Sequence, residues 1–176
     1  ENSFLCNTNV NDKKISLTHS PELVEIPGGY VRLAKMGEGH FTELGQPELP
    51  TYTTYYQLDP SKTYEFRLNI VDSYFIEDIQ VLPHQGMDKW EVESVSFINE
   101  DVYNSYESFP QENMMISNRS QGRGVEFVNV SVIPYKYFPK YNKLEVYSSL
   151  DIEVIEIGDR EVYELNQPKR SHIFDE

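Results

Sequence analysis

The sequence predicts an all-β protein, an antiparallel two-sheet β-sandwich of the jelly-roll or carbohydrate-binding-module type. Residues 125–138 and 143–157 alternate apolar and polar side chains, which is the period of a half-buried strand. No segment sustains the 3.6-residue period of a helix. The 13 Tyr and 9 Phe suit pleated, half-buried surfaces. Short strands separated by Pro and Gly turns are typical of a sandwich.

Apolar runs bounded by turn signals define the strands. Shorter strands are predicted at 23–26, 30–36, 51–58, 90–97 and around 114–116. A long strand at 63–78 follows a DPSK turn. The two strongest strands, Val125–Tyr137 and Lys143–Ile157, flank the stretch FPKYNK, whose Pro and Asn predict a hairpin loop. We therefore expect these two strands to pair antiparallel.

The chain is predicted to be one domain with a real core. At 176 residues it is long enough to bury roughly 70% of its unfolded surface. The first dozen residues are polar, so residues 1–20 are predicted to be a mobile N-terminal segment. The sandwich is expected over 21–160, and an exposed C-terminal tail over 161–176.

Charge and hydropathy exclude several kinds of partner. A formal net charge of −14 argues against nucleic acid, because neutralising phosphates needs clustered Lys and Arg. It is compatible with a basic protein partner or with solubility alone. No run of 18 apolar residues exists, so no membrane span is predicted. No basic and apolar leader opens the chain, so either the protein was never secreted or a signal peptide has been removed.

The sequence predicts no catalytic residue, no metal and no cofactor. The histidines are assigned to separate loops: His19, His40, His84 and His172. No G-x-S-x-G, CxxC, HExxH or EF-hand pattern occurs. The single cysteine, Cys6, lies in a polar stretch that offers no base for a catalytic thiol. A Ca²⁺ site built from loop carboxylates such as Asp72 or Asp101 remains open.

The stretch HQGMDKWEVE contains an isolated basic residue. Lys89 is the only Lys or Arg between Arg67 and Arg119, in a tract rich in Asp and Glu, and it lies beside Trp90, the only Trp in the chain. Composition alone leaves two interpretations open, a solvated loop or a loop that binds an acidic pocket.

Three stretches carry a family resemblance. They are GQPELPTYTTYYQL, IVDSYFIEDIQVLPHQGM and GRGVEFVNVSVIPYKYFPKYNKLEVYSSLDIEVIE, all within residues 40–157. In order and spacing they resemble the N-terminal propeptide of gingipain-type cysteine peptidases, peptidase family C25. The tail SHIFDE is similar to the segment that leads into the catalytic domain of these enzymes.

The resemblance implies a non-catalytic prodomain, an inhibitor and intramolecular chaperone that keeps a zymogen latent until proteolytic removal. Its partner would be the catalytic domain of a cognate C25-type cysteine peptidase, outside this chain. Such enzymes are bacterial, secreted or on the cell surface, mostly through type IX secretion. They cut after Arg or Lys, but the family also includes a surface protease with another preference, so the resemblance leaves the specificity open.

The resemblance also implies an inhibitory loop. In this family a basic side chain of the prodomain enters the specificity pocket of the enzyme, from a loop after the motif that matches VLPHQGM. The matching position is Lys89 or, without a gap, Trp90, and only Lys89 can imitate a basic substrate side chain. Gly86 and Met87 are expected to shape the turn, and Met87, Asp88 and Trp90 complete the loop.

Two further groups of basic residues are candidate functional sites, one for inhibition and one for processing. Arg119 and Arg123, in the long loop before the strand at 125, are the runner-up position for the inhibitory group. The pair Lys169–Arg170, between the last strand and the expected catalytic domain, is the predicted processing site.

Two other functions stay open. A carbohydrate-binding or adhesive β-sandwich could stack sugars on exposed aromatic rings, for which Trp90, Tyr103 and Tyr106 are candidates. A structural domain could help its neighbouring domain to fold without inhibiting it.

Overall fold

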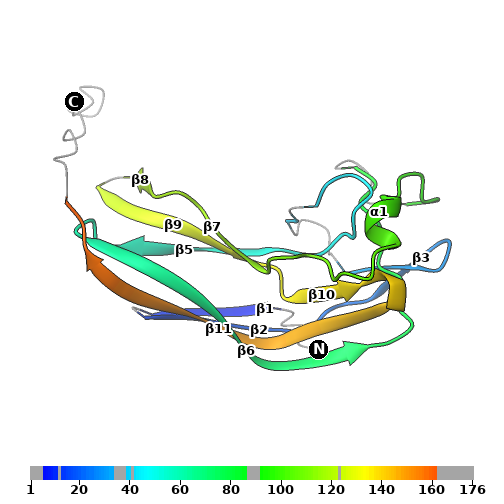
Figure 1. Ribbon diagram of the computed structural model, residues 1–176, viewed down its shortest axis with the longest axis horizontal. Helices are drawn as coiled ribbons and strands as arrows, with labels where there is room; N and C mark the ends of the chain where they lie inside the picture. Colours follow the sequence, from blue (N-terminus) through cyan, green and yellow to red (C-terminus); the bar gives the residue numbers. More distant parts are fainter. Residues whose placement is uncertain are drawn as a thin grey trace, which may run out of the picture.

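The structure is a computed structural model that describes residues 6–11, 13–33, 39–40, 42–86, 92–122 and 124–161. Within these residues the protein is an antiparallel β-sandwich, as predicted, formed by a five-stranded and a four-stranded sheet (Figure 1). A separate hairpin pairs β3 (Val24–Ile26) with β4 (Tyr30–Arg32). The one-turn helix α1 (Glu100–Tyr103) and the 3₁₀ turn η1 (Pro139–Tyr141) lie in connections.

The five-stranded sheet is built around its longest strand, and we call it the β11 sheet. Its members are β1 (Cys6–Asn11), β2 (Lys14–His19), β6 (Lys62–Ile76), β10 (Tyr135–Phe138) and β11 (Lys143–Asp159). β6 pairs along nearly the whole of β11, so it occupies one edge of that strand. β10 and β2 pair with successive parts of the other edge.

The four-stranded sheet is built around β9, and we call it the β9 sheet. Its members are β5 (Tyr52–Leu58), β7 (Met114–Ile116), β8 (Ser120–Gly122) and β9 (Val125–Val132). β5 pairs with β9 from residue 126 to 132, whereas β7 and β8 share its other edge. Figure 1 shows this sheet facing the β11 sheet across the body of the molecule.

The alternating sequence pattern explains the core between the sheets. Every second residue of β2 and β9 is buried, so one face of each strand packs inward. The buried residues of this core are Ile15, Leu17, Tyr56, Leu58, Val128, Val130, Val132, Tyr147, Leu150, Ile152 and Val154. Because these side chains come from both sheets, their burial holds the two layers together.

The expected long strand Val125–Tyr137 is divided between the two sheets. β9 ends at Val132 in the β9 sheet, and β10 begins at Tyr135 in the β11 sheet. Pro134 lies at the crossing, where a residue without an N–H cannot continue a ladder. The Asn113 side chain donates to the carbonyls of Ile133 (2.7 Å) and Tyr135 (2.6 Å). The predicted pairing therefore holds only for β10 and β11, joined by η1 and the left-handed Asn142.

The prediction that residues 1–20 precede the sandwich is wrong. β1 and β2 form a hairpin, and β2 pairs with β11 from residue 149 to 153. Ile15 and Leu17 are buried in the core, because KISLTH alternates like the longer strands. Among the described residues, the sandwich thus begins with β1 at Cys6.

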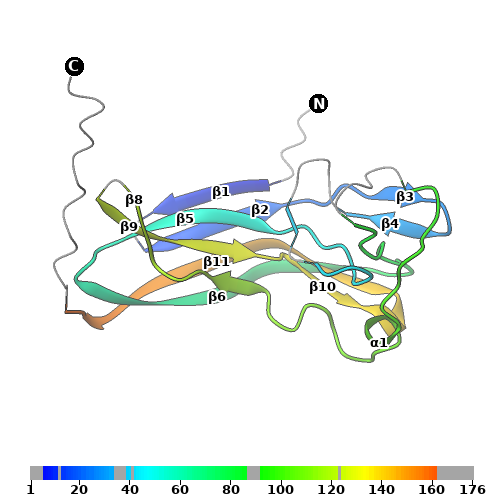
Figure 2. The same ribbon diagram turned by 90° about the horizontal axis from the view of Figure 1, so that it is seen from above.

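A second core lies under the loops at the other end of β10 and β11. It contains Leu33, Leu49, Ile79, Val81, Ile133, Tyr135, Tyr137, Leu144 and Val146. Figure 2 shows the β3–β4 hairpin and α1 at this end, while β8 and the end of β11 lie at the opposite end. The described parts of the loops at 39–50 and 80–99 therefore lie on this second core, to which Leu49 and Val81 belong.

Candidate functional site

Gln85 joins the two ends of the segment 86–95, which contains the predicted inhibitory loop. Its side chain is 3% exposed, and its Oε1 accepts from the backbone N–H groups of Ser96 (2.7 Å) and Phe97 (3.1 Å). Its Nε2 donates to the carbonyls of Pro83 (2.9 Å) and Phe97 (2.7 Å). One buried amide therefore joins the chain just before residue 86 to the chain at 96–97, as the stem of a loop.

Gly45 fixes the same stem from the other side. Its N–H donates to the carbonyl of His84, and its carbonyl accepts from the N–H of Asn99, each at 2.8 Å. A Cβ on Gly45 would lie 2.9 Å from the Asn99 nitrogen, and the φ of Gly45 is +82°. Only glycine fits here without strain, since both the backbone angle and the close approach exclude a side chain. This gives a physical reason for the Gly in GQPELP.

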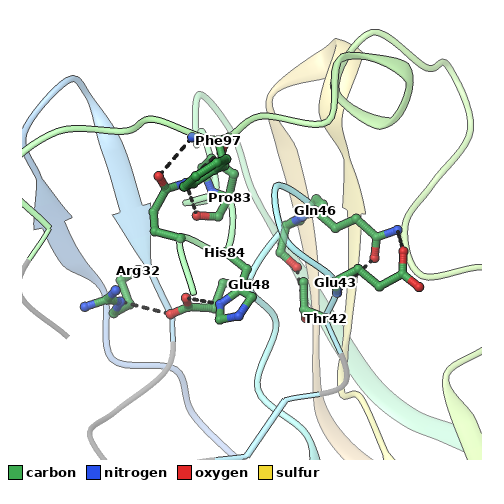
Figure 3. A network of polar contacts seen from close by, with 10 residues as sticks. Arg32, Thr42, Glu43, Gln46, Glu48, Pro83, His84 and Phe97 are labelled. Atoms are coloured by element: carbon green, nitrogen blue, oxygen red, sulfur yellow. Dashed lines mark hydrogen bonds and ion pairs between the residues drawn. The ribbon is translucent and has the colours of Figure 1, made fainter. Parts of the chain in front are cut away.

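A buried ion pair lies beside the stem. Arg32 Nε donates to Glu48 Oε1 at 2.9 Å, and both residues are at most 5% exposed. His84 Nδ1 lies 3.3 Å from the other carboxylate oxygen, Glu48 Oε2. Figure 3 shows Arg32, Glu48 and His84 joined in one network, with Pro83 and Phe97 close by. Because β4, the 45–50 loop and the stem each contribute a residue, the network ties these three segments together.

Paired backbone positions set the geometry of this network. Glu48 N–H donates to the carbonyl of Leu82, and His84 N–H donates to the carbonyl of Gln46, both at 2.8 Å. Pro47 and Pro83 form an isolated antiparallel bridge between these bonds. The side chains of Glu48 and His84 are therefore held near one another by main-chain bonds, independently of their own contact.

His40 completes a cluster with this pair. Its ring centroid lies 4.3 Å from that of His84, edge to face, and its Nδ1 is buried without a hydrogen-bond partner among the described residues. Burial lowers the pKa of His40, and the nearby His84 lowers this pKa further. Among the described residues, His40, Glu48 and His84 form the only group with metal-ligand spacing, and Asp72 and Asp101 belong to none.

Sequence reasoning missed this cluster. It assigned the histidines to separate loops, but His19 lies in β2 and faces the core, and His40 and His84 meet. No motif could have revealed the meeting, since it depends on the bridge between residues 47 and 83. The GQPELP segment, whose Glu48 lies beside two prolines and a buried Leu49, was the available signal.

The predicted inhibitory loop lies largely outside the described residues. Met87, Asp88, Lys89 and Trp90 lie outside the described residues, and the structure describes the chain on either side of them. On one side Gly86 has a φ of +111°, which agrees with a turn at this position. The strand predicted at 90–97 is wrong for residues 92–97, because the N–H groups at 96 and 97 bind Gln85 and not a neighbouring strand.

The runner-up residue Arg119 points into the molecule. Its Nη1 donates to the buried carboxylate of Glu126 at 2.9 Å, and its Nη2 donates to the carbonyl of Lys62. Its guanidinium also lies 5.9 Å from the centre of the Tyr64 ring. These contacts place Arg119 beside β8, at the end of the molecule away from the stem (Figure 2). Arg123, Lys169 and Arg170 lie outside the described residues.

Of the aromatic residues considered for sugar stacking, the two that the structure describes, Tyr103 and Tyr106, lie in different surroundings. The hydroxyl of Tyr103 donates to the carbonyl of Val81 at 2.8 Å, and its ring packs against the second core. Tyr106 is 70% exposed and lies edge-on to Tyr141, with centroids 6.1 Å apart. Trp90 lies outside the described residues. In the described part of the chain no helix has the length and apolar character needed to cross a membrane.

Comparisons with known proteins agree with the resemblance. The family model Propeptide_C25 matches residues 20–175. Gingipain R1 of Porphyromonas gingivalis is 27% identical over 142 residues, which are 78% of this chain and 14% of that protein. The chain therefore spans a small part of this curated relative.

Two solved structures have a similar fold. A chain in the complex of the P. gingivalis RgpB pro- and mature domains is 17% identical, with a TM-score of 0.67, and the match covers 93% of this chain and 92% of that one. A chain in a structure that concerns the zymogenic latency of gingipain K, from the same organism, is 25% identical with a TM-score of 0.60. That match covers 87% of this chain and 91% of the other.

Proposed function

The chain belongs to the C25 propeptide family, and from this premise we propose that it keeps a C25-type cysteine peptidase latent. The match of Propeptide_C25 to residues 20–175 carries this proposal. Membership in a propeptide family confirms the expectation of a non-catalytic prodomain. Its partner is then the catalytic domain of its own peptidase, and the similarity to the structure concerned with gingipain K latency supports inhibition as its role.

Lys89 is the residue that we assign to the specificity pocket. It is the only Lys or Arg between Arg67 and Arg119, so no other Lys or Arg of this stretch could take its place in an acidic pocket. An ammonium entering such a pocket makes charge-assisted hydrogen bonds in a desolvated place. The acidic neighbours of Lys89 would fit a basic rim around that pocket or keep the loop soluble.

The stem supports this role by limiting the freedom of the loop. An inhibitor that imitates a substrate must present its loop in one conformation, because ordering a flexible loop on binding lowers the affinity. The Gln85 amide and the Gly45 backbone hold the two ends of the loop segment. Met87, Asp88 and Trp90 would then shape and brace the short span that carries Lys89.

Inhibition of the cognate catalytic domain by variants of this chain tests the assignment. We expect Lys89→Ala to raise the inhibition constant by at least about 100-fold, as for loss of one partner of a buried interfacial charge pair. Lys89→Arg should retain most of the inhibition, and Gln85→Ala should weaken it through the stem. Lys140→Ala, which removes an exposed basic side chain in η1, is the matched control and should inhibit like the wild type.

The outcomes separate the residue from the function. Inhibition by a folded Lys89→Ala variant at the wild-type constant would overturn the assignment of Lys89. No inhibition by the wild-type chain would overturn latency, and a chain that only raises the yield of refolded enzyme would be a folding helper. Circular dichroism of each variant shows whether a lost effect comes from the loop or from unfolding.

Removal of the prodomain belongs to the same proposal. We place the processing site at Lys169–Arg170, after the last strand, where a peptidase that cuts after basic residues could act on its own precursor. We also assign the protein to a secreted or cell-surface bacterial enzyme exported by type IX secretion, with the prodomain as intramolecular chaperone.

A further inference from the structure

The donor set of His40, Glu48 and His84 is outside the inhibitory mechanism proposed above. Each residue offers one ligand atom, and these atoms all lie within 4.8 Å of one another. Glu48 and His84 are buried, and His40 is half-buried. Three convergent donors from two loops, two imidazoles and one carboxylate, are the protein ligands of many zinc sites.

The distances fit a tetrahedral ion. Zinc binds imidazole nitrogen and carboxylate oxygen at about 2.0–2.1 Å, so two ligand atoms of a tetrahedral site lie about 3.4 Å apart. His84 Nδ1 and Glu48 Oε2 are 3.3 Å apart. Their separation therefore already matches one edge of the tetrahedron, and the ligand atom of His40 lies within 4.8 Å of both.

His40 provides an independent observation. Its Nδ1 is buried and has no hydrogen-bond partner among the described residues. Buried polar atoms are normally paired, so one that lacks a partner beside two other donors is explained by a ligand that it binds. The carbonyl of Gly39 accepts from the N–H of Thr51 at 2.8 Å, which anchors the backbone next to His40.

Arg32 positions the carboxylate. It binds Glu48 Oε1 at 2.9 Å and leaves Oε2 directed at His84. Outer contacts of this kind orient metal ligands in characterised sites. Because Arg32 offsets part of the charge of Glu48, the imidazoles must supply much of the affinity. This favours a borderline ion such as zinc over Ca²⁺ or Mg²⁺, which require several oxygen ligands.

We propose that His40, Glu48 and His84 bind one divalent transition-metal ion of the zinc class, with a fourth position open to water. His84 lies two residues before Gly86, so a bound ion would stiffen the stem of the loop that carries Lys89. This consequence for inhibition rests on the proposed function, whereas binding of the ion does not.

Metal titration of the free 176-residue chain tests the proposal without any peptidase. After treatment with a chelator and dialysis, calorimetric titration with Zn²⁺ should show one saturable site, and Zn²⁺ should raise the midpoint of thermal unfolding. Co²⁺ should give the visible absorption of a tetrahedral ion. His40→Ala and His84→Ala should each weaken binding at least tenfold, and the Co²⁺ spectrum should be lost.

Matched controls distinguish this site from adventitious binding. His172→Ala removes a histidine that the proposal does not use, and Glu43→Ala removes an exposed carboxylate of the same loop as Glu48, so both should bind like the wild type. If an alanine variant unfolds, Glu48→Gln and His40→Gln keep the size of the side chains and should still weaken binding. Absence of a saturable site, or binding that survives loss of His40 and disappears with His172, would overturn the proposal.

Discussion

At the scale of single residues, Gln85 and His19 are two buried polar side chains in opposite situations. Gln85 makes four hydrogen bonds with the backbone around it, so its burial carries little desolvation cost. Neither ring nitrogen of His19 has a hydrogen-bond partner among the described residues. Its ring lies between those of Tyr135 (4.8 Å) and Tyr52 (5.8 Å). The first residue therefore stabilises a loop, and the second makes stability depend on pH.

Acid should destabilise the protein through His19. Burial lowers the pKa of His19 from 6.5 to about 4, so below pH 6.5 the unfolded chain binds a proton that the folded chain does not. The stability that comes from neutral His19 is thus fully present above pH 6.5 and is lost as the pH falls toward 4. We expect a loss of about 2 kcal/mol in the free energy of unfolding between pH 7 and pH 5, measured by urea denaturation.

The variant His19→Leu isolates this contribution. It should lose about 2 kcal/mol less than the wild type over the same pH interval, since leucine does not titrate. Thr18→Ala, an exposed neighbour in β2, should keep the wild-type pH dependence. An equal pH dependence of His19→Leu and wild type would contradict the lowered pKa.

At the scale of elements, β11 organises the sandwich. It pairs with β2, β6 and β10, and its inward residues Leu150 and Ile152 belong to the core between the sheets. Beyond residue 155 its side chains become exposed, and Ile157 is 57% exposed. The same strand thus offers a buried and an exposed isoleucine.

Truncation of these two isoleucines should have very different effects. Ile152→Ala should lower the free energy of unfolding by about 2–5 kcal/mol, because it removes buried methyl groups and leaves a cavity. Ile157→Ala should change it by less than about 0.5 kcal/mol. Urea denaturation of both variants measures the difference, and similar values would mean that β11 is not buried as described.

Long stretches of alternating apolar and polar residues predicted strands correctly. The sequence did not reveal where a strand crosses from one sheet to the other, or where a side chain takes the backbone hydrogen bonds of a segment. The stretches 63–78 and 143–157 were predicted as strands and occur as β6 and β11, because their patterns persist over many residues. The division between β9 and β10 depends on how Pro134 and Asn113 meet in space, which no local pattern contains. Residues 92–97 resemble a strand in composition, but the N–H groups of Ser96 and Phe97 donate to the side chain of Gln85, which lies 11 and 12 residues earlier.

Only the part of the candidate site that lies in one continuous stretch of sequence could be predicted. Lys89 stands out by charge alone, since its isolation is a property of the linear sequence. The cluster of His40, Glu48 and His84 is formed by two loops, 39–50 and 80–99, that meet through backbone pairing. Its members follow no known metal-binding spacing, so no sequence motif connects His40 and Glu48 with His84.

At the scale of the whole molecule, the two ends of the sandwich are held by different contacts. One end is held by the hydrogen bonds of Gln85 and the network of Glu48, and the other by ion pairs of Glu126. The Gln85 stem and the Glu48 network lie at the end with α1 and the β3–β4 hairpin. At the other end Glu126 accepts from both Arg119 (2.9 Å) and Arg160 (3.1 Å), which ties β9 to the last strand. Two long strands, β6 and β11, connect these ends, so the loop that we assign to inhibition is presented by the whole sandwich.

The N-terminal hairpin should be essential to this scaffold. Deleting residues 1–20 removes β1 and β2, and with them Ile15 and Leu17 from the core between the sheets. Two such losses cost about 4 kcal/mol or more, at the lower values for truncation of buried aliphatic residues. The deletion also leaves an edge of β11 unpaired from 149 to 153, which favours aggregation.

Comparison of two deletions tests this expectation. The 21–176 chain should unfold at a much lower urea concentration than the full chain, or should fail to fold. The 6–176 chain, which keeps both strands, should unfold close to the full chain. A strand paired with β11 contributes to the core, whereas a mobile leader does not. Equal urea midpoints of unfolding for 21–176 and the full chain would therefore mean that the sandwich begins at residue 21.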